Sequence, residues 1–307
     1  MHPNESHDPL GLNSPVKQNL GVGIGFRRKF FKSIFETKRQ IDWLEIVSEN
    51  FMLFGGKPRR VLEQAKEKWS IIPHGVSLSL GSVDPLNPEY LDKLKDLADF
   101  LDSPWVSDHL CFSSFSGNTY HDLLPLPSTV EAVDHVSERI QRVQNKLGRP
   151  FAIENISAYF IPDENEFPES EMICQILEKA DCLLLLDVNN VYVNSRNHGF
   201  NAMDFIRALP RDRIIQTHLA GHWDQGDIII DTHGDAVVEP VWNLYEDFLR
   251  WLGRPVTTLI EWDNDIPELD IVCDQADRAR AIQDQIFRER KNESQNLPRE
   301  MAPGISL

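Results

Sequence analysis

Acidic residues and histidines recur in this sequence at the ends of short apolar runs. Glu154 ends FAIE, Asp187 ends LLLLD and Glu261 ends TTLIE, and histidines interrupt other runs of the same kind. The set comprises four histidines, four carboxylates and one amide: His74, His109, Glu154, Asp187, Asn190, His218, Asp231, His233 and Glu261. Imidazole nitrogens and carboxylate oxygens, without any cysteine, are donors that iron, manganese and zinc accept in proteins.

Carboxylates that follow apolar runs need compensation, because an isolated buried charge is strongly unfavourable. Taken singly, each of these residues is more often an ordinary polar residue at a strand end. As a set they require positive charge, yet no Lys or Arg stands at the predicted strand ends, and Arg27 is the nearest candidate. Bound cations with neutral imidazole co-ligands would supply that charge. Because one ion takes only about four to six ligands, the set predicts more than one ion, with carboxylates as bridges.

The runs that carry these residues belong to a regular alternation of β-rich and amphipathic segments. Several of the β-rich runs are almost continuously apolar, which is typical of parallel strands covered on both faces. Eight strands are predicted, at residues 21–26, 43–47, 71–80, 105–112, 151–155, 182–187, 214–219 and 256–261. Eight strand–helix units predict an α/β protein with a (β/α)8 (TIM) barrel, in which the carboxyl ends of the strands meet at one mouth.

Helix signals occupy the segments between the predicted strands. Asn87 and Pro88 are a cap and a first-turn proline, residues 128–131 have the form of a capping box, and Gly253 suits the end of a helix that begins near Pro240. A doubly wound open sheet is the alternative fold. It would need a glycine-rich phosphate turn after the first strand, and GVGIGF matches that only in part.

Length and composition predict one catalytic domain at residues 20–290, with flexible tails at 1–19 and 291–307. The chain has no apolar stretch long enough for a membrane span and no signal-peptide pattern. Its four cysteines form no C-x-x-C pair, which favours free thiols in a reducing cytoplasm. The net charge of −17 argues against a general nucleic-acid binder, since such proteins usually present a basic face.

Ten stretches in order carry a resemblance to a known family: GVGIGFR, LEIVSENFM, HGVSLSLGS, SDHLCF, HDLLPLP, AIENISAY, LLLDVNNVYVNS, THLAGH, DTHGDAV and LIEWDNDIP. Over residues 20–285 the sequence resembles the multinuclear non-haem iron-dependent oxidative enzymes. That family includes the oxygenase of methanobactin biosynthesis and belongs to the xylose-isomerase-like barrels. The resemblance implies two or three iron ions of mixed valence, with zinc or manganese as alternatives. It also implies dioxygen-dependent modification of cysteines in a ribosomally made precursor peptide, often presented by a small partner protein encoded nearby.

The resemblance also implies how the ligands divide among three sites. His74, His109 and Glu154 would hold one iron, and Glu154, Asp187, His218 and Glu261 would share the middle one. A third and more labile site would be completed by Asn190, Asp231 and His233.

Two other branches of the superfamily remain as alternatives. One is the endonuclease IV-like phosphodiesterase, which uses three zinc ions on abasic DNA and has a His where this chain has Asn190. An amide is a weaker ligand than imidazole and fits a labile third site better. The other is a sugar isomerase or epimerase, which would need a Lys near the metals, and no clear candidate is present.

Three further residues are candidates for roles beyond metal binding. Glu49, after the second predicted strand, is a candidate for contact with substrate or a metal-bound water, with loop capping as the alternative. His222, four residues after His218, is a candidate proton donor, against the simpler reading of a surface histidine. Asp263, beside the last strand end, is a candidate for binding substrate or partner.

Overall fold

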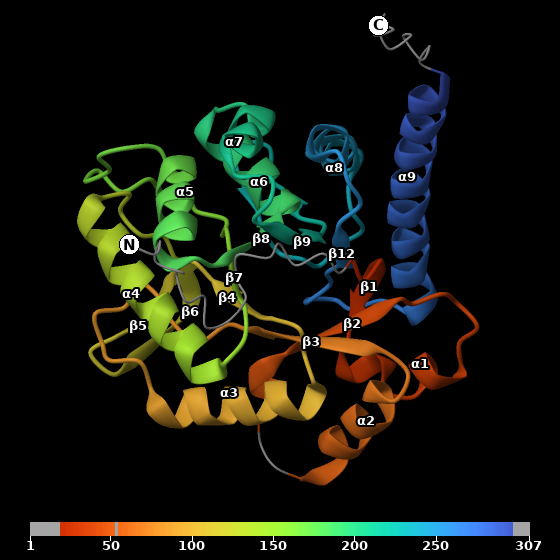
Figure 1. The fold of residues 1–307 in the computed structure, drawn as a ribbon, viewed down its shortest axis with the longest axis horizontal. Coiled ribbons are helices and arrows are strands. Elements are labelled where there is room, and N and C mark those ends of the chain that lie inside the picture. Colours follow the sequence, from red (N-terminus) through yellow and green to blue (C-terminus); the bar gives the residue numbers. More distant parts are fainter. Residues whose placement is uncertain (1–18, 53–54, 297–307) are drawn as a thin grey trace, which may run out of the picture.

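Eight parallel strands close into a barrel in the order β1-β12-β9-β8-β7-β4-β3-β2 (Figure 1). They are β1 (Val22–Gly25), β2 (Trp43–Val47), β3 (Ser70–Gly75), β4 (Val106–His109), β7 (Phe151–Glu154), β8 (Leu183–Asp187), β9 (Ile214–Leu219) and β12 (Thr257–Ile260). The computed structural model describes residues 19–52 and 55–296. The predicted (β/α)8 barrel is confirmed, and each strand overlaps the segment predicted for it.

Helices surround the barrel on the outside (Figure 1). They are α1 (Ser33–Glu36), α2 (Gly56–Lys66), α3 (Pro88–Leu101), α4 (Val130–Leu147), α5 (Glu169–Ala180), α6 (Val188–His198), α7 (Ala202–Ala208), α8 (Glu239–Leu252) and α9 (Leu269–Asn296). Two short 3-10 turns, η1 (Arg28–Phe30) and η2 (Ser48–Asn50), follow β1 and β2. Two small antiparallel pairs lie outside the barrel: β5 (Phe112–Phe115) with β6 (Asn118–Leu124), and β10 (Trp223–Asp224) with β11 (Ile229–Ile230).

Local sequence signals determine several helix ends. Asn87 accepts hydrogen bonds from two backbone N–H groups of the first turn of α3, which begins at Pro88 as predicted. Gly253 follows α8 with a φ of 83°, the left-handed conformation that glycine adopts readily. The predicted capping box is wrong by one residue, because Thr129 rather than Ser128 caps α4.

The β5–β6 hairpin between β4 and α4 was not predicted. Its two connecting residues, Ser116 and Gly117, have φ values of 51° and 74°, as a two-residue hairpin turn requires. The predicted strand at 105–112 was too long, because the barrel strand ends at His109 and the chain then enters the hairpin. The strand at 71–80 was also too long, and the barrel strand ends at Gly75.

A buried apolar layer fills the barrel beneath the ligand candidates. Side chains alternate along a strand, so residues two apart share a face. Four interior apolar residues each lie two positions before a ligand candidate on the same strand face: Ile72, Ala152, Leu185 and Leu259. Trp43 and Trp105 complete this layer. The polar side chains above it are therefore closed off from solvent on their lower side.

Gly23 adjoins the same layer and explains the glycines of GVGIGF. A Cβ at Gly23 would lie 2.6 Å from the Trp43 ring, closer than side-chain atoms can approach. The glycine therefore makes room for a tryptophan in the barrel. This packing role, together with the closed barrel, removes the phosphate-turn interpretation and the doubly wound alternative.

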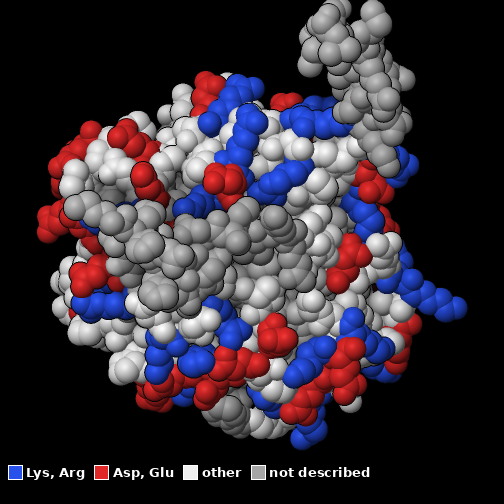
Figure 2. Space-filling model, viewed as in Figure 1, with Lys and Arg blue, Asp and Glu red and all other residues white. Residues whose placement is uncertain are grey.

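The chain ends and the surface add two observations. Helix α9 continues to Asn296, past the expected boundary at residue 290; of the two expected tails, residues 1–18 and 297–307 lie outside the described residues. Within the described residues, every helix is too short or too polar to cross a lipid bilayer. Acidic and basic side chains lie interspersed on the described part of the face in Figure 2. Some charged residues of the helices form local ion pairs, such as Lys93 with Glu89 in α3.

Candidate metal centre

Six predicted ligands stand at the carboxyl ends of six barrel strands and converge on one mouth. They are His74, His109, Glu154, Asp187, His218 and Glu261, from β3, β4, β7, β8, β9 and the residue after β12. Their side chains are between 0% and 12% exposed. The barrel thus gathers, in one dry region, groups that lie up to 187 positions apart in the sequence, from His74 to Glu261.

The first donor group is formed by two histidines and one carboxylate. The Nε2 atoms of His74 and His109 each lie 3.2 Å from Glu154 Oε2, and the three residues present one ligand atom each within 4.8 Å of one another. The other ring nitrogens are held from behind: His74 Nδ1 by the Ser107 hydroxyl at 2.9 Å, and His109 Nδ1 by the Gly75 carbonyl at 3.2 Å. Both Nε2 atoms therefore face the mouth together.

The second donor group shares Glu154 with the first. His218 Nδ1 lies 3.1 Å from Glu154 Oε1 and 2.9 Å from Glu261 Oε2, and Asp187 completes a group of four within 4.8 Å. Glu154 thus turns one oxygen toward each group. A carboxylate in this position can bridge two metal ions a few ångströms apart.

The third group centres on His233, in the loop between β11 and α8. Its φ is 45°, a left-handed conformation that is unusual for a residue with a side chain and that recurs at functional sites. His233 Nδ1 lies 3.2 Å from Glu261 Oε2 and 3.5 Å from Asp263 Oδ2, while Nε2 lies 2.8 Å from Asp231 Oδ1. The third site was expected from Asn190, Asp231 and His233, but of these only His233 belongs to the third donor group, which Glu261 and Asp263 complete. Asp231 pairs with the opposite ring nitrogen of His233, and the Asn190 side chain donates a hydrogen bond to the Asn155 carbonyl.

Several of these donors have no hydrogen-bond partner among the described residues. The buried unpaired atoms include Glu154 Oε2, Asp187 Oδ2, Asn190 Oδ1, His218 Nδ1 and His233 Nε2. Glu154 Oε2 and His218 Nδ1 lie about 3 Å from other nitrogen or oxygen atoms, but these approaches lack hydrogen-bond geometry. Buried polar atoms are rarely left unpaired. The donor set therefore fits bound cations, and five of the predicted ligands supply the unpaired atoms.

Without a cation, the site is compensated by protons. Burial raises the pKa of Glu154 to about 7 and that of Asp187 well above its usual range. Burial lowers the pKa of His218 and His233, but neighbouring carboxylates outweigh it and leave both pKa values well above normal. Burial likewise raises the pKa of Glu261, yet these two histidines bring it well below its usual range. Carboxylates and imidazoles that share protons in this way release them when a metal binds.

One arginine provides partial compensation. Arg27, the nearest basic candidate in the sequence, lies 3.6 Å from Glu261 Oε1 and donates a short hydrogen bond to Asp263. It stands at the edge of the mouth, and among the described residues no other Lys or Arg pairs with the predicted ligands. Arg27 therefore compensates the charge of Glu261 and Asp263 in part. Glu154 and Asp187 have no basic side chain beside them among the described residues.

Glu45 belongs to the site and was missed by sequence reasoning. Its Oε2 accepts a hydrogen bond from Gln216 Nε2 at 2.6 Å and lies 3.1 Å from His218 Nε2. It is 1% exposed. The only sequence signal was an acidic residue inside the apolar run WLEIV; Glu45 shares a strand face with Trp43, which the structure places inside the barrel.

The candidates for other roles occupy distinct places around the mouth. Glu49 Oε1 accepts hydrogen bonds from the Tyr90 hydroxyl and the Val76 N–H, which matches the loop-capping alternative. His222 is 8% exposed, so it is not a surface histidine; its ring stacks on Tyr192 and its Nδ1 lies 2.7 Å from Asn189 Oδ1. Asp263 pairs with Arg27 and His233, as described above.

Comparison with known proteins identifies relatives along nearly the whole barrel. The model of the family described as RiPP precursor modification enzyme MbnB/TglH/ChrH matches residues 21–284. The chain is 47% identical over 268 residues to a UPF0276 protein of Anaeromyxobacter sp. strain Fw109-5, covering 87% of this chain and 94% of that one. It is 48% identical over 259 residues to a UPF0276 protein of Acaryochloris marina, covering 84% and 93%.

Solved structures with a similar fold are sugar epimerases. D-psicose 3-epimerase, crystallised in the presence of D-fructose, aligns with a TM-score of 0.56 at 13% identity, covering 87% of this chain and 99% of the epimerase. L-ribulose 3-epimerase gives 0.57 at 13% identity, covering 93% and 100%. At this identity the likeness shows a shared (β/α)8 barrel fold and nothing of the reaction. The family match and the relatives go further: this chain belongs to the MbnB/TglH/ChrH family of RiPP precursor modification enzymes.

Proposed function

We propose that this chain binds two or three iron ions of mixed valence and uses dioxygen to modify cysteine residues of a ribosomally made precursor peptide. The observation that carries the proposal is the presence of three contiguous donor groups joined through Glu154 and Glu261. A single-ion site needs no shared carboxylates. Membership of a family that modifies precursor peptides supports the substrate class.

The donor types suit iron, as they also suit manganese and zinc, and the resemblance to iron-dependent oxidative enzymes is the reason to propose iron. All the clustered ligands are imidazoles and carboxylates, a set that suits non-haem iron and leaves positions open for other ligands. Cys111, near the first group, is buried and has its thiol pKa raised well above normal, so it favours a neutral thiol over a ligand thiolate. When bound, iron would supply one-electron chemistry and dioxygen activation and would accept a substrate thiolate. The Asn190 amide, a weak ligand, supports a labile third site rather than a third tightly held zinc.

Glu45 fixes the orientation of a central ligand. Gln216 donates to Glu45 through Nε2, while its Oε1 accepts from the Trp105 ring N–H at 2.8 Å, so the amide has one orientation only. His218 Nε2 lies 3.1 Å from Glu45 Oε2 and 3.0 Å from Gln216 Nε2. In the metal-loaded state we propose that Nε2–H donates to Glu45, which leaves the lone pair of Nδ1 for a metal. A carboxylate behind a ligand histidine sets its tautomer and raises its basicity.

His222 is placed to accept a proton. Asn189 donates through Nδ2 to Asp231 Oδ1 at 2.9 Å, so its oxygen faces His222 and must accept from Nδ1–H. The lone pair of His222 therefore resides on Nε2. Burial lowers the pKa of His222 and keeps the ring neutral near pH 7. We assign it as the acceptor of the substrate proton, a base rather than the donor expected from sequence.

The function is tested with a cysteine-containing precursor peptide encoded beside the gene, together with its partner protein. Iron-loaded enzyme in air should change the peptide's mass at cysteine, and a Cys→Ser peptide should remain unmodified. Full turnover without dioxygen, or with zinc alone, contradicts the proposal. Cleavage of abasic DNA by zinc-loaded protein would support the endonuclease alternative instead.

Glu154→Gln should weaken metal binding while the metal-free protein still folds. In the wild type, metal at 100 times its dissociation constant should raise the unfolding free energy by about 2.7 kcal/mol. The variant loses the shared carboxylate, so we expect less than half that gain and fewer ions per chain. Glu178→Gln, an exposed change, is the control. Denaturant titration with and without a chelator measures the stabilisation by metal in each protein. If metal stabilises Glu154→Gln as much as the wild type, Glu154 does not bridge two ions.

Glu45→Gln should weaken the site through His218. The change keeps the side-chain size but replaces one carboxylate oxygen by an NH2 group that cannot accept and removes the negative charge. We expect a 10- to 100-fold loss of activity or metal affinity. The electron paramagnetic resonance spectrum of the iron-loaded variant should shift, because the basicity of one ligand changes. An unaltered spectrum with reduced activity would assign Glu45 a purely structural role.

His222→Gln should lower the rate about 100-fold, in the range for lost general-base catalysis, with metal content unchanged. A base acts when neutral, so wild-type activity should fall as pH drops through the pKa of His222. That acidic limb of the pH–rate profile should be absent from the variant. His135→Gln, which changes a histidine bonded to the Ser82 carbonyl, is the control. An unchanged profile in His222→Gln would exclude the assignment.

A further inference from the structure

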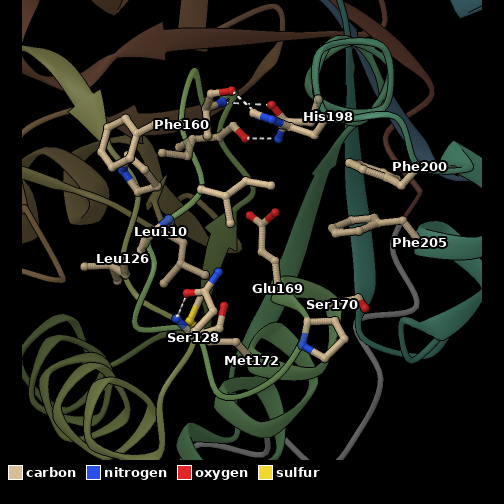
Figure 3. A pocket seen from close by; sticks show the side chains of 18 of the residues that line it. Leu110, Leu126, Ser128, Phe160, Glu169, Ser170, Met172, His198, Phe200 and Phe205 are labelled. Carbon is tan, nitrogen blue, oxygen red and sulfur yellow. Dashed lines mark hydrogen bonds between the residues drawn. The ribbon is translucent and has the colours of Figure 1, made fainter.

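A cavity of about 540 Å³ lies beside the metal centre, between the loops after β4 and β7 and the helices α5, α6 and α7 (Figure 3). Its wall is mainly apolar and includes Leu110, Leu126, Ile156, Met172, Phe200 and Phe205. At its rim, Phe160 and Ile161 are 52% and 58% exposed. Clustered exposed apolar side chains around a hollow are typical of binding surfaces.

The Glu169 carboxyl group points into the middle of this cavity, between Leu110 on one wall and Phe205 on the other (Figure 3). Glu169 is the first residue of α5, and no described residue pairs with its carboxylate by hydrogen bond or ion pair. It keeps partial exposure through the cavity mouth, but apolar surroundings raise its pKa to about 7, with no neighbouring charge contributing. A carboxylate in such surroundings lacks the counter-charge that would stabilise it.

The other polar groups of the wall are engaged. Asn194 bonds the Ile156 carbonyl and the Ala158 N–H, and His198 Nε2 bonds the Ala158 carbonyl. Asp204, at the rim, accepts a hydrogen bond from Arg207. Glu169 therefore stands out among the described residues of the wall as a carboxyl group without a partner, and a cationic group on a ligand would stabilise its ionised form.

We propose that this cavity binds a segment of the precursor peptide in which a large apolar side chain is followed by Lys or Arg, whose cation pairs with Glu169. The assignment rests on the proposed peptide substrate. The apolar wall accommodates the first side chain, and the methylene stem of the second covers apolar surface on the way to the carboxylate. A neutral apolar ligand would bury the carboxylate without a partner, which is costly.

Two short stretches of chain link the wall of the cavity to the metal centre. Leu110 directly follows the predicted ligand His109, and Ile156 lies two residues after Glu154. Ser157, beside Ile156, donates a hydrogen bond to Asp231. The anchor would therefore bind a part of the peptide close in sequence to the cysteine that reaches the metals.

Three peptide probes test the assignment on the full-length protein: acetyl-Phe-Lys-amide, acetyl-Phe-Gln-amide and acetyl-Ala-Lys-amide. Titrations followed by NMR give their dissociation constants without turnover. The Phe-Lys probe should bind about tenfold more tightly than either other probe, because hydrogen bonds to charged groups and buried aromatic rings each contribute at least that much. Equal affinities, or no binding at millimolar concentration, would overturn the assignment.

Glu169→Gln should abolish the preference for Lys over Gln while affinity for the Phe-Gln probe changes less than about twofold. Retained Phe-Gln binding reports that the variant is folded. Glu171→Gln, an exposed acidic residue in the same helical turn, should keep the preference; loss there too would indicate general charge attraction and overturn the assignment.

Turnover separates this inference from the proposed function. With the full precursor, Glu169→Gln should raise KM and leave kcat unchanged. If the probes behave as expected but no dioxygen-dependent reaction occurs, the iron proposal fails and the cavity assignment stands. If the reaction proceeds and Glu169→Gln changes neither KM nor probe binding, the cavity assignment alone is wrong.

Discussion

The structure depends on one constraint: Glu154, Asp187 and Glu261 are fixed close together in a buried mouth with too little positive charge around them. The apolar layer of Trp43, Trp105 and their neighbours closes the barrel below, so these carboxylates cannot relax into solvent on that side. Arg27 offsets only the Glu261 and Asp263 edge. Multivalent cations complete this arrangement, and imidazoles interleaved between the carboxylates provide neutral ligands for them.

Residues behind the ligand candidates hold the histidine rings in fixed orientations. Ser107 and the Gly75 carbonyl orient the two histidines of the first group, and Glu45 orients His218 through the barrel interior. On the substrate side, Asn189 connects His222 to Asp231. A metal at this mouth would therefore meet ligands whose free atoms are already directed inward, which lowers the reorganisation that binding requires.

The barrel, and the meeting of six candidate ligands at its mouth, were predictable because these six residues stand at the carboxyl ends of apolar strands. Strand geometry then brings residues distant in sequence to one mouth, as His74 and Glu261 illustrate. Glu45 was harder to predict, because both faces of a parallel strand are apolar and the pattern does not reveal which face points inward. The role of Asp263 and the surroundings of Glu169 depend on loop conformations, for which hydrophobic periodicity provides no information. The β5–β6 hairpin was missed for a related reason, since its first strand continues the apolar run of β4.

The metal centre and the cavity at Glu169 are the two sites proposed to bind the peptide. The metal centre would take the reacting cysteine, and the cavity at Glu169 would take a basic, apolar segment nearby in the peptide. The most direct test of the central claim is elemental analysis with Mössbauer spectroscopy on freshly purified protein. The account predicts two or three iron ions per chain in both ferrous and ferric states. A chain that is fully folded with no metal bound, or that holds three zinc ions and takes up no iron, would contradict it.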